Sequence, residues 1–211
     1  YYRELFENLG VTGSDAAIAD SFARLPLLTK SKINNNRQLM ISEDLRGNGL
    51  DENSTGGSTG EVLRFFTDWR SGAYRKATVR RNKRWIGIRP GDREVRLWGA
   101  PLDLAKSKSL RGRLHSAITQ ERLLSADALD EKTLQQYLEI CQSFRPRLLV
   151  AYPSALAEFA RFCDRNGRRI ESLHAILCSA ETLSEYDRAL AERVFGVKVY
   201  DRYGCREVGD I

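Results

Sequence analysis

The second half of the chain alternates between short apolar runs and longer segments whose apolar residues recur at helical spacing. Short apolar runs are typical of buried strands, and spacings of three and four residues are typical of amphipathic helices. We predict strands over residues 94–101, 147–153, 173–181 and 197–204, with helices over residues 131–144, 154–167 and 183–196. This alternation predicts an α/β fold with a largely parallel sheet flanked by helices.

Residues that favour the start or the end of a helix lie at the ends of the predicted helices. Pro153 opens the second helix, and proline is tolerated there because a backbone N–H in the first turn has no acceptor within the helix. Ser184 is the predicted N-cap of the third helix. Gly167 and Gly196 follow the last apolar positions and predict where these two helices end.

The first half of the chain has a weaker pattern. We predict a helical and irregular N-terminal segment over residues 1–50. Trp69, Ala73 and Ala77 recur at helical spacing with basic residues around them, which predicts one helix over residues 68–85 whose exposed faces carry the charge. Gly87 suits the C-terminal end of that helix.

Basic residues concentrate between Arg75 and Arg113. This stretch has thirteen Lys or Arg against three acids, in a chain whose formal net charge is +6. Such a patch attracts phosphates on nucleic acids, membranes or nucleotides, although a solvated helix face is the simpler explanation. The sequence has no zinc-finger or aromatic-rich RNA-binding motif, so we expect no nucleic-acid partner.

Hydropathy and cysteine spacing narrow the class of protein further. The sequence has no apolar run of about 18 residues, so we expect no membrane-spanning helix. Its four cysteines form no CxxC pair, which is typical of reduced thiols in a cytoplasmic protein. Cys205 alone lies outside an apolar pattern, and it would bind zinc only with ligands from beyond Ile211.

A glycine-rich loop interrupts the chain before a strand-like apolar run over residues 61–66. Its residues are Ser54, Thr55, Gly56, Gly57, Ser58, Thr59 and Gly60. Glycines let backbone N–H groups come close to phosphate oxygens, and the hydroxyl groups add donors. The loop lacks the Lys-Ser/Thr ending of a Walker A motif, because Glu61 follows it. Composition alone therefore fits either a phosphate cradle or a linker.

The predicted strand ends are the positions to inspect for a ligand site, because ligands bind beyond the carboxyl ends of parallel strands. These positions are residues 99–101, 152–154, 179–181 and 201–207. Glu181 and Glu207 are carboxylates at two of these ends, placed to hold a metal ion or a sugar hydroxyl. The alternative for Glu181 is that it caps the helix that begins near Ser184.

Three motifs occur in a specific order: STGGSTGE, then CSAETLSE about 120 residues later, then YDRYGCREVG. In this order they resemble the adenylate-forming superfamily of acyl-CoA ligases. The segments LPLLTK and LLVAYPSALAEFA are similar to its phenylacetate–CoA ligase branch, including the capsular-polysaccharide-associated relatives. The resemblance covers nearly the whole chain and implies that residues 51–211 are an incomplete adenylation (AMP-binding) domain.

The resemblance implies an ATP-dependent enzyme with small-molecule partners. Such an enzyme joins ATP and a carboxylic acid into an acyl-adenylate plus pyrophosphate, and then passes the acyl group to coenzyme A. An aromatic acid is the acyl substrate that this branch implies. Mg²⁺ would accompany ATP, because this ion prefers carboxylate and phosphate oxygens.

The resemblance also assigns roles to individual residues. The glycine-rich loop would wrap the β- and γ-phosphates of ATP. Ser179, Ala180 and Glu181 would line the adenine pocket, Tyr203 would stack on the adenine, Gly204 would leave room for the nucleotide, and Glu207 would hold Mg²⁺. A flat π-surface such as adenine is well covered by an aromatic ring.

Two departures from the superfamily pattern leave alternatives open. Many members have Lys after the last loop glycine, where this chain has Glu61, a carboxylate that would repel phosphates if it pointed inward. The motif Y-G-x-T-E has Arg206 in place of Thr, and this guanidinium would either restore positive charge near the phosphates as a catalytic residue or pair with Glu207. The second hypothesis is therefore a non-catalytic adenylation-fold protein acting in polysaccharide biosynthesis.

The resemblance further implies an N-terminal fragment of a longer enzyme. The ribose-binding Asp, the hinge and the C-terminal Lys of the superfamily would lie beyond Ile211, so we expect the 211-residue chain alone to be inactive. A homodimer is an open alternative for its assembly.

Overall fold

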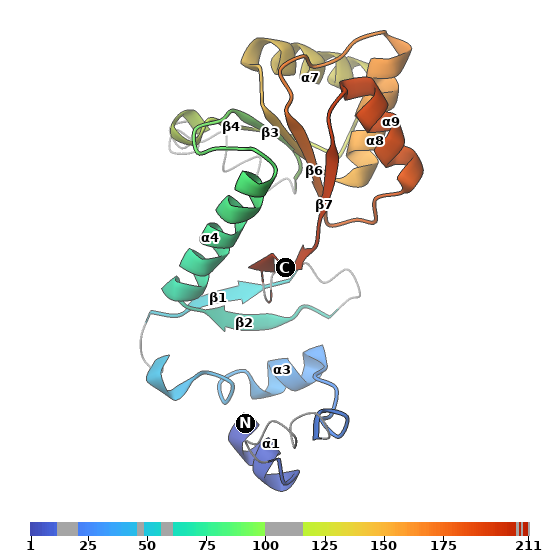
Figure 1. The fold of residues 1–211 in the computed structure, drawn as a ribbon. Coiled ribbons are helices and arrows are strands. Elements are labelled where there is room, and N and C mark those ends of the chain that lie inside the picture. Colours follow the sequence, from blue (N-terminus) through green and yellow to red (C-terminus); the bar gives the residue numbers. More distant parts are fainter. Residues whose placement is uncertain are drawn as a thin grey trace. The chain divides into compact units, whose positions relative to one another are not determined.

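The chain forms two compact units, an N-terminal unit over Tyr1–Lys76 and a C-terminal unit over Ala77–Ile211 (Figure 1). The computed structural model describes residues 1–11, 21–45, 49–55, 61–99, 116–205, 207 and 209–210. The boundary between the two units falls within the residue range of helix α4 (Trp69–Trp85).

The described residues of the N-terminal unit form short helices and a β-hairpin. These helices include α1 (Tyr2–Asn8), α3 (Lys30–Asn36) and the 3-10 helix η1 (Glu43–Leu45). Strands β1 (Asp51–Ser54) and β2 (Arg64–Thr67) pair antiparallel, with Ser54 opposite Arg64. The strand-like run expected from residue 61 therefore begins three residues later, and the glycine-rich loop belongs to the connection of a hairpin.

The C-terminal unit contains a five-stranded sheet in which neighbouring strands are parallel. Across the sheet the strands are β4 (Glu121–Leu124), β3 (Glu94–Leu97), β5 (Leu148–Ala151), β6 (Ala175–Ser179) and β7 (Val199–Arg202). The predicted parallel α/β sheet is confirmed, and four of its strands fall within predicted ranges. Strand β4 is missing from the prediction, because its sequence ERLL has only two apolar residues and lies among polar segments.

Three helices of this unit match the predicted helices. They are α7 (Glu131–Phe144), α8 (Pro153–Arg165) and α9 (Glu185–Phe195). Ser184 caps α9, since its hydroxyl accepts a hydrogen bond from the backbone N–H of Asp187 at 3.1 Å. Gly196 ends α9 with a φ of 68°, a left-handed conformation that glycine adopts without a Cβ penalty. A two-stranded ladder, β8 (Gly204–Cys205) with β9 (Gly209–Asp210), follows the sheet.

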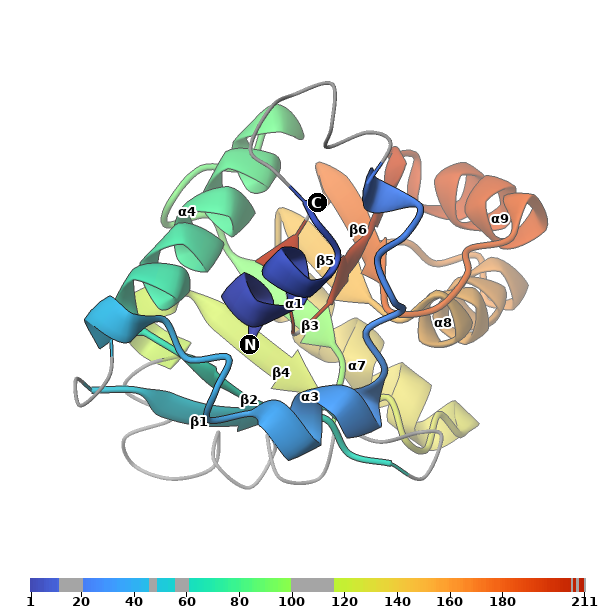
Figure 2. The same cartoon turned by 90° about the horizontal axis from the view of Figure 1, so that it is seen from below.

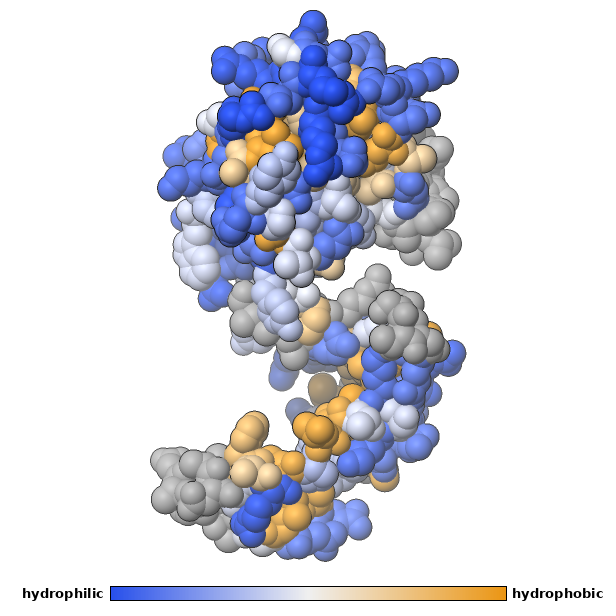
Figure 3. Space-filling model, turned by 90° about the vertical axis from the view of Figure 1, so that its right-hand side faces the viewer, coloured by the Kyte–Doolittle hydropathy of each residue, from blue (hydrophilic) through white to orange (hydrophobic). Residues whose placement is uncertain are grey.

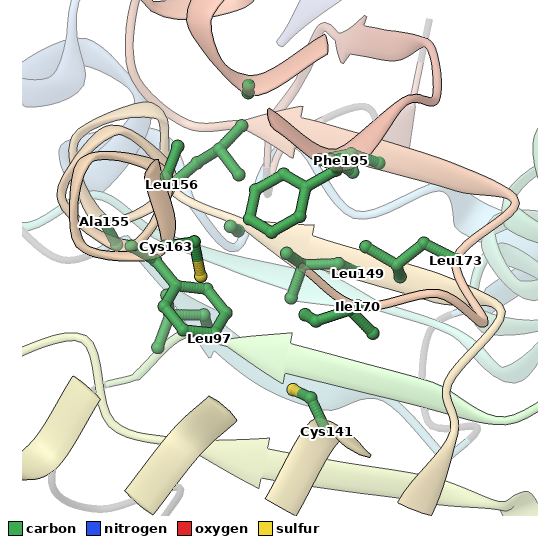
Figure 4. Close-up of a cluster of buried hydrophobic side chains, with 14 of the residues drawn as sticks. Leu97, Cys141, Leu149, Ala155, Leu156, Cys163, Ile170, Leu173 and Phe195 are labelled. Carbon is green, nitrogen blue, oxygen red and sulfur yellow. The ribbon is translucent and has the colours of Figure 1, made fainter. Parts of the chain in front are cut away.

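The three helices pack on one face of the sheet, and α8 and α9 lie side by side (Figures 1 and 2). Their side chains and alternate strand residues form one buried cluster, which includes Leu97, Cys141, Leu149, Leu156, Cys163 and Phe195 (Figure 4). The intervening strand residues, among them Leu148, Val150, Ala175 and Leu177, pack with Ile88 in a second cluster. The central strands are therefore apolar on both sides, as parallel strands require.

Helix α4 agrees with the helix predicted over residues 68–85. The Asp68 carboxylate caps it by accepting a hydrogen bond from the backbone N–H of Ser71 at 2.8 Å, and Gly87 follows its end with a φ of 79°. No residue of α4 is buried, and Trp69 is 73% exposed, so the apolar positions of this helix do not form a buried stripe. The Arg81 guanidinium lies over the Trp85 ring at 4.7 Å, a cation–π contact at the surface.

The surface of the C-terminal unit drawn in the upper half of Figure 3 is largely hydrophilic. Among the described residues, no helix has both the length and the apolar character needed to cross a bilayer.

Candidate functional site

The carboxyl ends of the five parallel strands form one edge of the sheet, which we call the carboxyl edge. The strand register places Leu97, Ala151, Cys178 and Asp201 in one row across four neighbouring strands. The residues that follow this row, including Trp98, Tyr152, Ser179 and Arg202, therefore gather at the carboxyl edge. Ligand sites of parallel α/β sheets lie at this edge. The described residues at the predicted strand-end positions therefore come together there.

Two aromatic rings stack at the carboxyl edge. Trp98 follows β3 and Tyr152 follows β5, and their ring centroids lie 4.0 Å apart with 24° between the ring planes. Tyr152 is also the N-cap residue of α8. Because β3 and β5 are neighbours in the sheet, the pair forms a continuous apolar wall. The sequence places both residues near strand ends, but only the register shows that they touch.

Ser179 joins the ends of β6 and β7. Its side chain is almost fully buried, and its hydroxyl donates to the backbone oxygen of Arg202 at 2.9 Å. The Arg202 Nε lies 3.4 Å from the same hydroxyl, as a weaker donor. This link fixes the backbone immediately before Tyr203, a connection that the sequence pattern does not reveal.

Ala180 has a left-handed backbone at the turn that follows β6. Its φ is 75°, a conformation that a residue with a Cβ seldom adopts. Such strain persists only where neighbouring contacts hold it, and it concentrates at ligand sites. Here the neighbouring contacts come from Ser179 on one side and Glu181 on the other.

Glu181 caps helix α8, and not the helix that begins near Ser184, which was the expected alternative. Its Oε2 accepts a hydrogen bond from the backbone N–H of Ser154, at 3.0 Å, in the first turn of α8. Ser184 itself caps α9. A carboxylate at this position is favoured by the unpaired N–H groups and dipole of the α8 N-terminus. Glu181 therefore ties the turn after β6 to the turn after β5.

The segment after β7 presents an exposed ring and an exposed carboxylate. Tyr203 is 72% exposed, so its ring is accessible to a flat ligand. Gly204 opens strand β8, and Glu207 lies in the turn that links β8 to β9, with its side chain at the surface. Arg206 lies outside the described residues, so its two predicted alternatives both stay open.

The glycine-rich loop is described only at its first two residues. The backbone N–H of Thr55 donates to the backbone oxygen of Leu63 at 3.0 Å, and the N–H of Leu63 donates to the Thr55 hydroxyl at 3.3 Å. Ser54 is the last residue of β1. Gly56, Gly57, Ser58, Thr59 and Gly60 lie outside the described residues, so their contact with phosphate stays a prediction.

Metal-binding side chains do not cluster in the described part of the chain, where groups of three or more His, Cys, Asp or Glu in metal-binding proximity are absent. Cys205 is exposed in β8, and its binding of zinc with ligands from beyond Ile211 stays a prediction.

The cysteines predict a simple reactivity test. Burial raises the pKa of Cys141, Cys163 and Cys178 to about 12, so these three groups remain protonated at pH 8. Because the thiolate is the reactive form, they should resist a disulfide reagent, whereas the exposed Cys205 should react. We expect titration at pH 8 to detect one fast thiol in the folded chain and four in denaturant. A second fast thiol would show that one of the buried positions opens to solvent.

Comparison with known proteins identifies the fold. No family model matches the sequence. The chain is 26% identical over 208 residues to protein CapK of Staphylococcus aureus, covering 98% of the chain and 46% of that relative. A structure of 2-hydroxyisobutyryl-CoA ligase with 2-HIB-AMP and CoA matches 99% of the chain and 45% of its own length, at a TM-score of 0.65 and 18% identity. An anthranilate CoA ligase with anthranoyl-AMP matches 74% of the chain and 29% of its own length, at a TM-score of 0.53 and 18% identity.

These similarities show that the chain has the fold of adenylate-forming CoA ligases, as the order of its motifs predicted. The chain spans about half the length of CapK and of the 2-hydroxyisobutyryl-CoA ligase.

Proposed function

We propose that the full-length protein containing this chain activates a carboxylic acid with ATP, forming an acyl-adenylate and pyrophosphate, and then transfers the acyl group to coenzyme A. The observation that carries the proposal is the match of 99% of the chain to a CoA ligase whose structure holds an acyl-AMP and CoA. The carboxyl edge supports it independently, because strained backbone and an exposed ring meet where parallel sheets bind ligands.

The described residues have properties that suit the proposed roles. The left-handed turn at Ala180 would present backbone groups to the adenine, while the Tyr203 ring would cover its flat face. Gly204 has no side chain to obstruct the nucleotide. The glycine-rich loop and Arg206 would surround the phosphates, where hydroxyls, N–H groups and a guanidinium stabilise negative charge.

Glu207 fits a magnesium ligand. Its carboxylate is at the surface of a turn, and Mg²⁺ is usually held by one or two carboxylates together with phosphate oxygens and water. When bound, the ion would neutralise charge on the departing pyrophosphate.

We propose that the acyl group is aromatic, by analogy with the phenylacetate–CoA ligase branch. The stacked Trp98 and Tyr152 give the carboxyl edge an apolar wall that would favour a flat or apolar acid.

Pyrophosphate exchange on the full-length protein tests this function. The assay would compare phenylacetate, anthranilate and 2-hydroxyisobutyrate, each with ATP and Mg²⁺, against a reaction without acid. We expect at least one acid to raise the exchange rate by about tenfold or more, since acyl-adenylate formation is the only reversible route for labelled pyrophosphate into ATP. Binding of ATP with no acid-dependent exchange across a broad panel would favour the non-catalytic hypothesis instead.

A further inference from the structure

Glu61, the residue that departs from the superfamily pattern, is held by helix α3. The Ser31 hydroxyl donates to its carboxylate, with Oγ at 3.0 Å from Oε1 and 3.2 Å from Oε2. Asn34 Nδ2 lies 3.4 Å from Oε1 as a second donor. The ammonium of Lys30 donates to the backbone oxygen of Glu61 at 3.2 Å. Both the side chain and the backbone of Glu61 are therefore anchored on α3.

Asn34 also holds the residues that lead into β2. Its Nδ2 donates to the backbone oxygen of Val62 at 3.0 Å, and its Oδ1 accepts the backbone N–H of Arg64 at 3.0 Å. One amide side chain thus supplies a donor and an acceptor to alternate backbone groups, as a neighbouring strand would. These contacts keep residues 62–64 in one extended position.

The opposite side of the same segment is held by the start of the glycine-rich loop. Leu63 is 4% exposed, and its backbone exchanges hydrogen bonds with the N–H and hydroxyl of Thr55. The two ends of the connection between β1 and β2 are therefore joined at Thr55 and Leu63, and the second end is fixed again by α3.

We infer that Ser31, Asn34 and Glu61 are positioning residues that set where the glycine-rich loop ends, and hence how it meets the phosphates of ATP. This inference rests on the proposed function. The carboxylate of Glu61 is directed to the donors of α3, so it acts as an anchor rather than as a phosphate-repelling charge. The departure from Lys at this position then no longer supports a non-catalytic protein.

The expected effect of each contact is modest, because these hydrogen bonds lie at the surface. The net free energy of one hydrogen bond corresponds to a roughly two- to tenfold change in a binding constant. We therefore expect Ser31→Ala, Asn34→Ala and Glu61→Ala to raise the KM for ATP by about two- to tenfold each in the full-length protein. The KM for coenzyme A should stay unchanged, and the melting temperature should fall by no more than a few degrees, because a surface hydrogen bond contributes only about 1 kcal/mol to stability.

A double-mutant cycle separates positioning from charge. If Glu61 acts through α3, the double variant of Ser31→Ala with Glu61→Ala should be no worse than the more severe single variant. Asn35→Ala is the matched control, since Asn35 is an exposed neighbour on the same helix. Glu61→Gln is the charge control, and it should not strengthen ATP binding.

Amide hydrogen exchange supplies a readout that does not depend on activity. The Arg64 amide, which donates to Asn34, should exchange faster in Asn34→Ala and at the normal rate in Asn35→Ala. An unchanged Arg64 amide would refute the anchor, and a faster amide with an unchanged KM for ATP would refute the positioning role. Tighter ATP binding in Glu61→Gln would show that the carboxylate faces the phosphates. A wild-type protein that binds no ATP would refute the proposed function, while the exchange data would still decide whether the anchor exists.

Discussion

Lys83→Met should destabilise the C-terminal unit by about 3 kcal/mol, because it leaves a buried carboxylate without its cation. Glu94, the first residue of β3, is only 3% exposed, and the Lys83 ammonium from α4 forms an ion pair with its Oε2. Within the described residues, its Oε1 has no hydrogen-bond partner, and Arg96 Nε lies 4.0 Å away. The nearby guanidinium offsets part of the loss, so we expect the lower end of the usual range for a broken buried pair.

Urea denaturation combined with hydrogen exchange at β3 would measure this loss. Lys132→Met removes the same charge from an exposed position of α7 and should change stability by less than about 0.5 kcal/mol. Replacing both partners, as Lys83→Met with Glu94→Leu, should restore much of the lost stability, since no charge is then buried alone. Equal and small effects in Lys83→Met and Lys132→Met would mean that Arg96 or solvent already satisfies Glu94.

Glu207→Gln should lower the rate of pyrophosphate exchange in the full-length protein by about 100-fold or more. The substitution keeps the size of the side chain but removes the charge that would hold Mg²⁺, and stabilisation of a charged transition state by a metal amounts to several kcal/mol. Because the side chain lies at the surface of a turn, the melting temperature should change little.

A matched variant makes this prediction specific. Glu185→Gln removes one carboxylate from an exposed position in the first turn of α9, where it pairs only loosely with Arg188 at 3.7 Å. We expect this variant to retain normal exchange. Recovery of exchange at high Mg²⁺ in Glu207→Gln would support a role in metal binding, whereas near-normal exchange at ordinary Mg²⁺ would remove Glu207 from the site.

The sequence predicted the parallel sheet because its central strands are apolar on both faces, as in LLVA of β5 and AILCS of β6. Strand β4 was not predicted. It is an edge strand, which needs fewer apolar residues than a central one, and its ERLL sequence resembles the polar segments around it. The helix ends were predictable for a similar reason, since Pro153, Ser184 and Gly196 act through local backbone geometry.

The candidate site was predictable only as a set of positions. Sequence order places Glu181 after a strand, but its partner, the N–H of Ser154, lies 27 residues earlier and becomes a neighbour only through the strand register. The contact between Glu61 and Ser31 spans 30 residues in the same way. Thr29 caps the start of α3 in the structure, whereas the sequence predicted only a helical and irregular segment over residues 1–50. Nothing local indicates that this helix would bind the chain beyond the glycine-rich loop.

The single exposed thiol of Cys205 makes the protein convenient to label. Cys205 lies two residues from Tyr203 and two from Glu207, while the other three thiols are buried. A fluorophore or spin label attached there would therefore report from beside the proposed adenine and magnesium positions, without any engineered cysteine. A nucleotide titration followed by such a probe would yield an affinity and an exchange rate from the natural sequence.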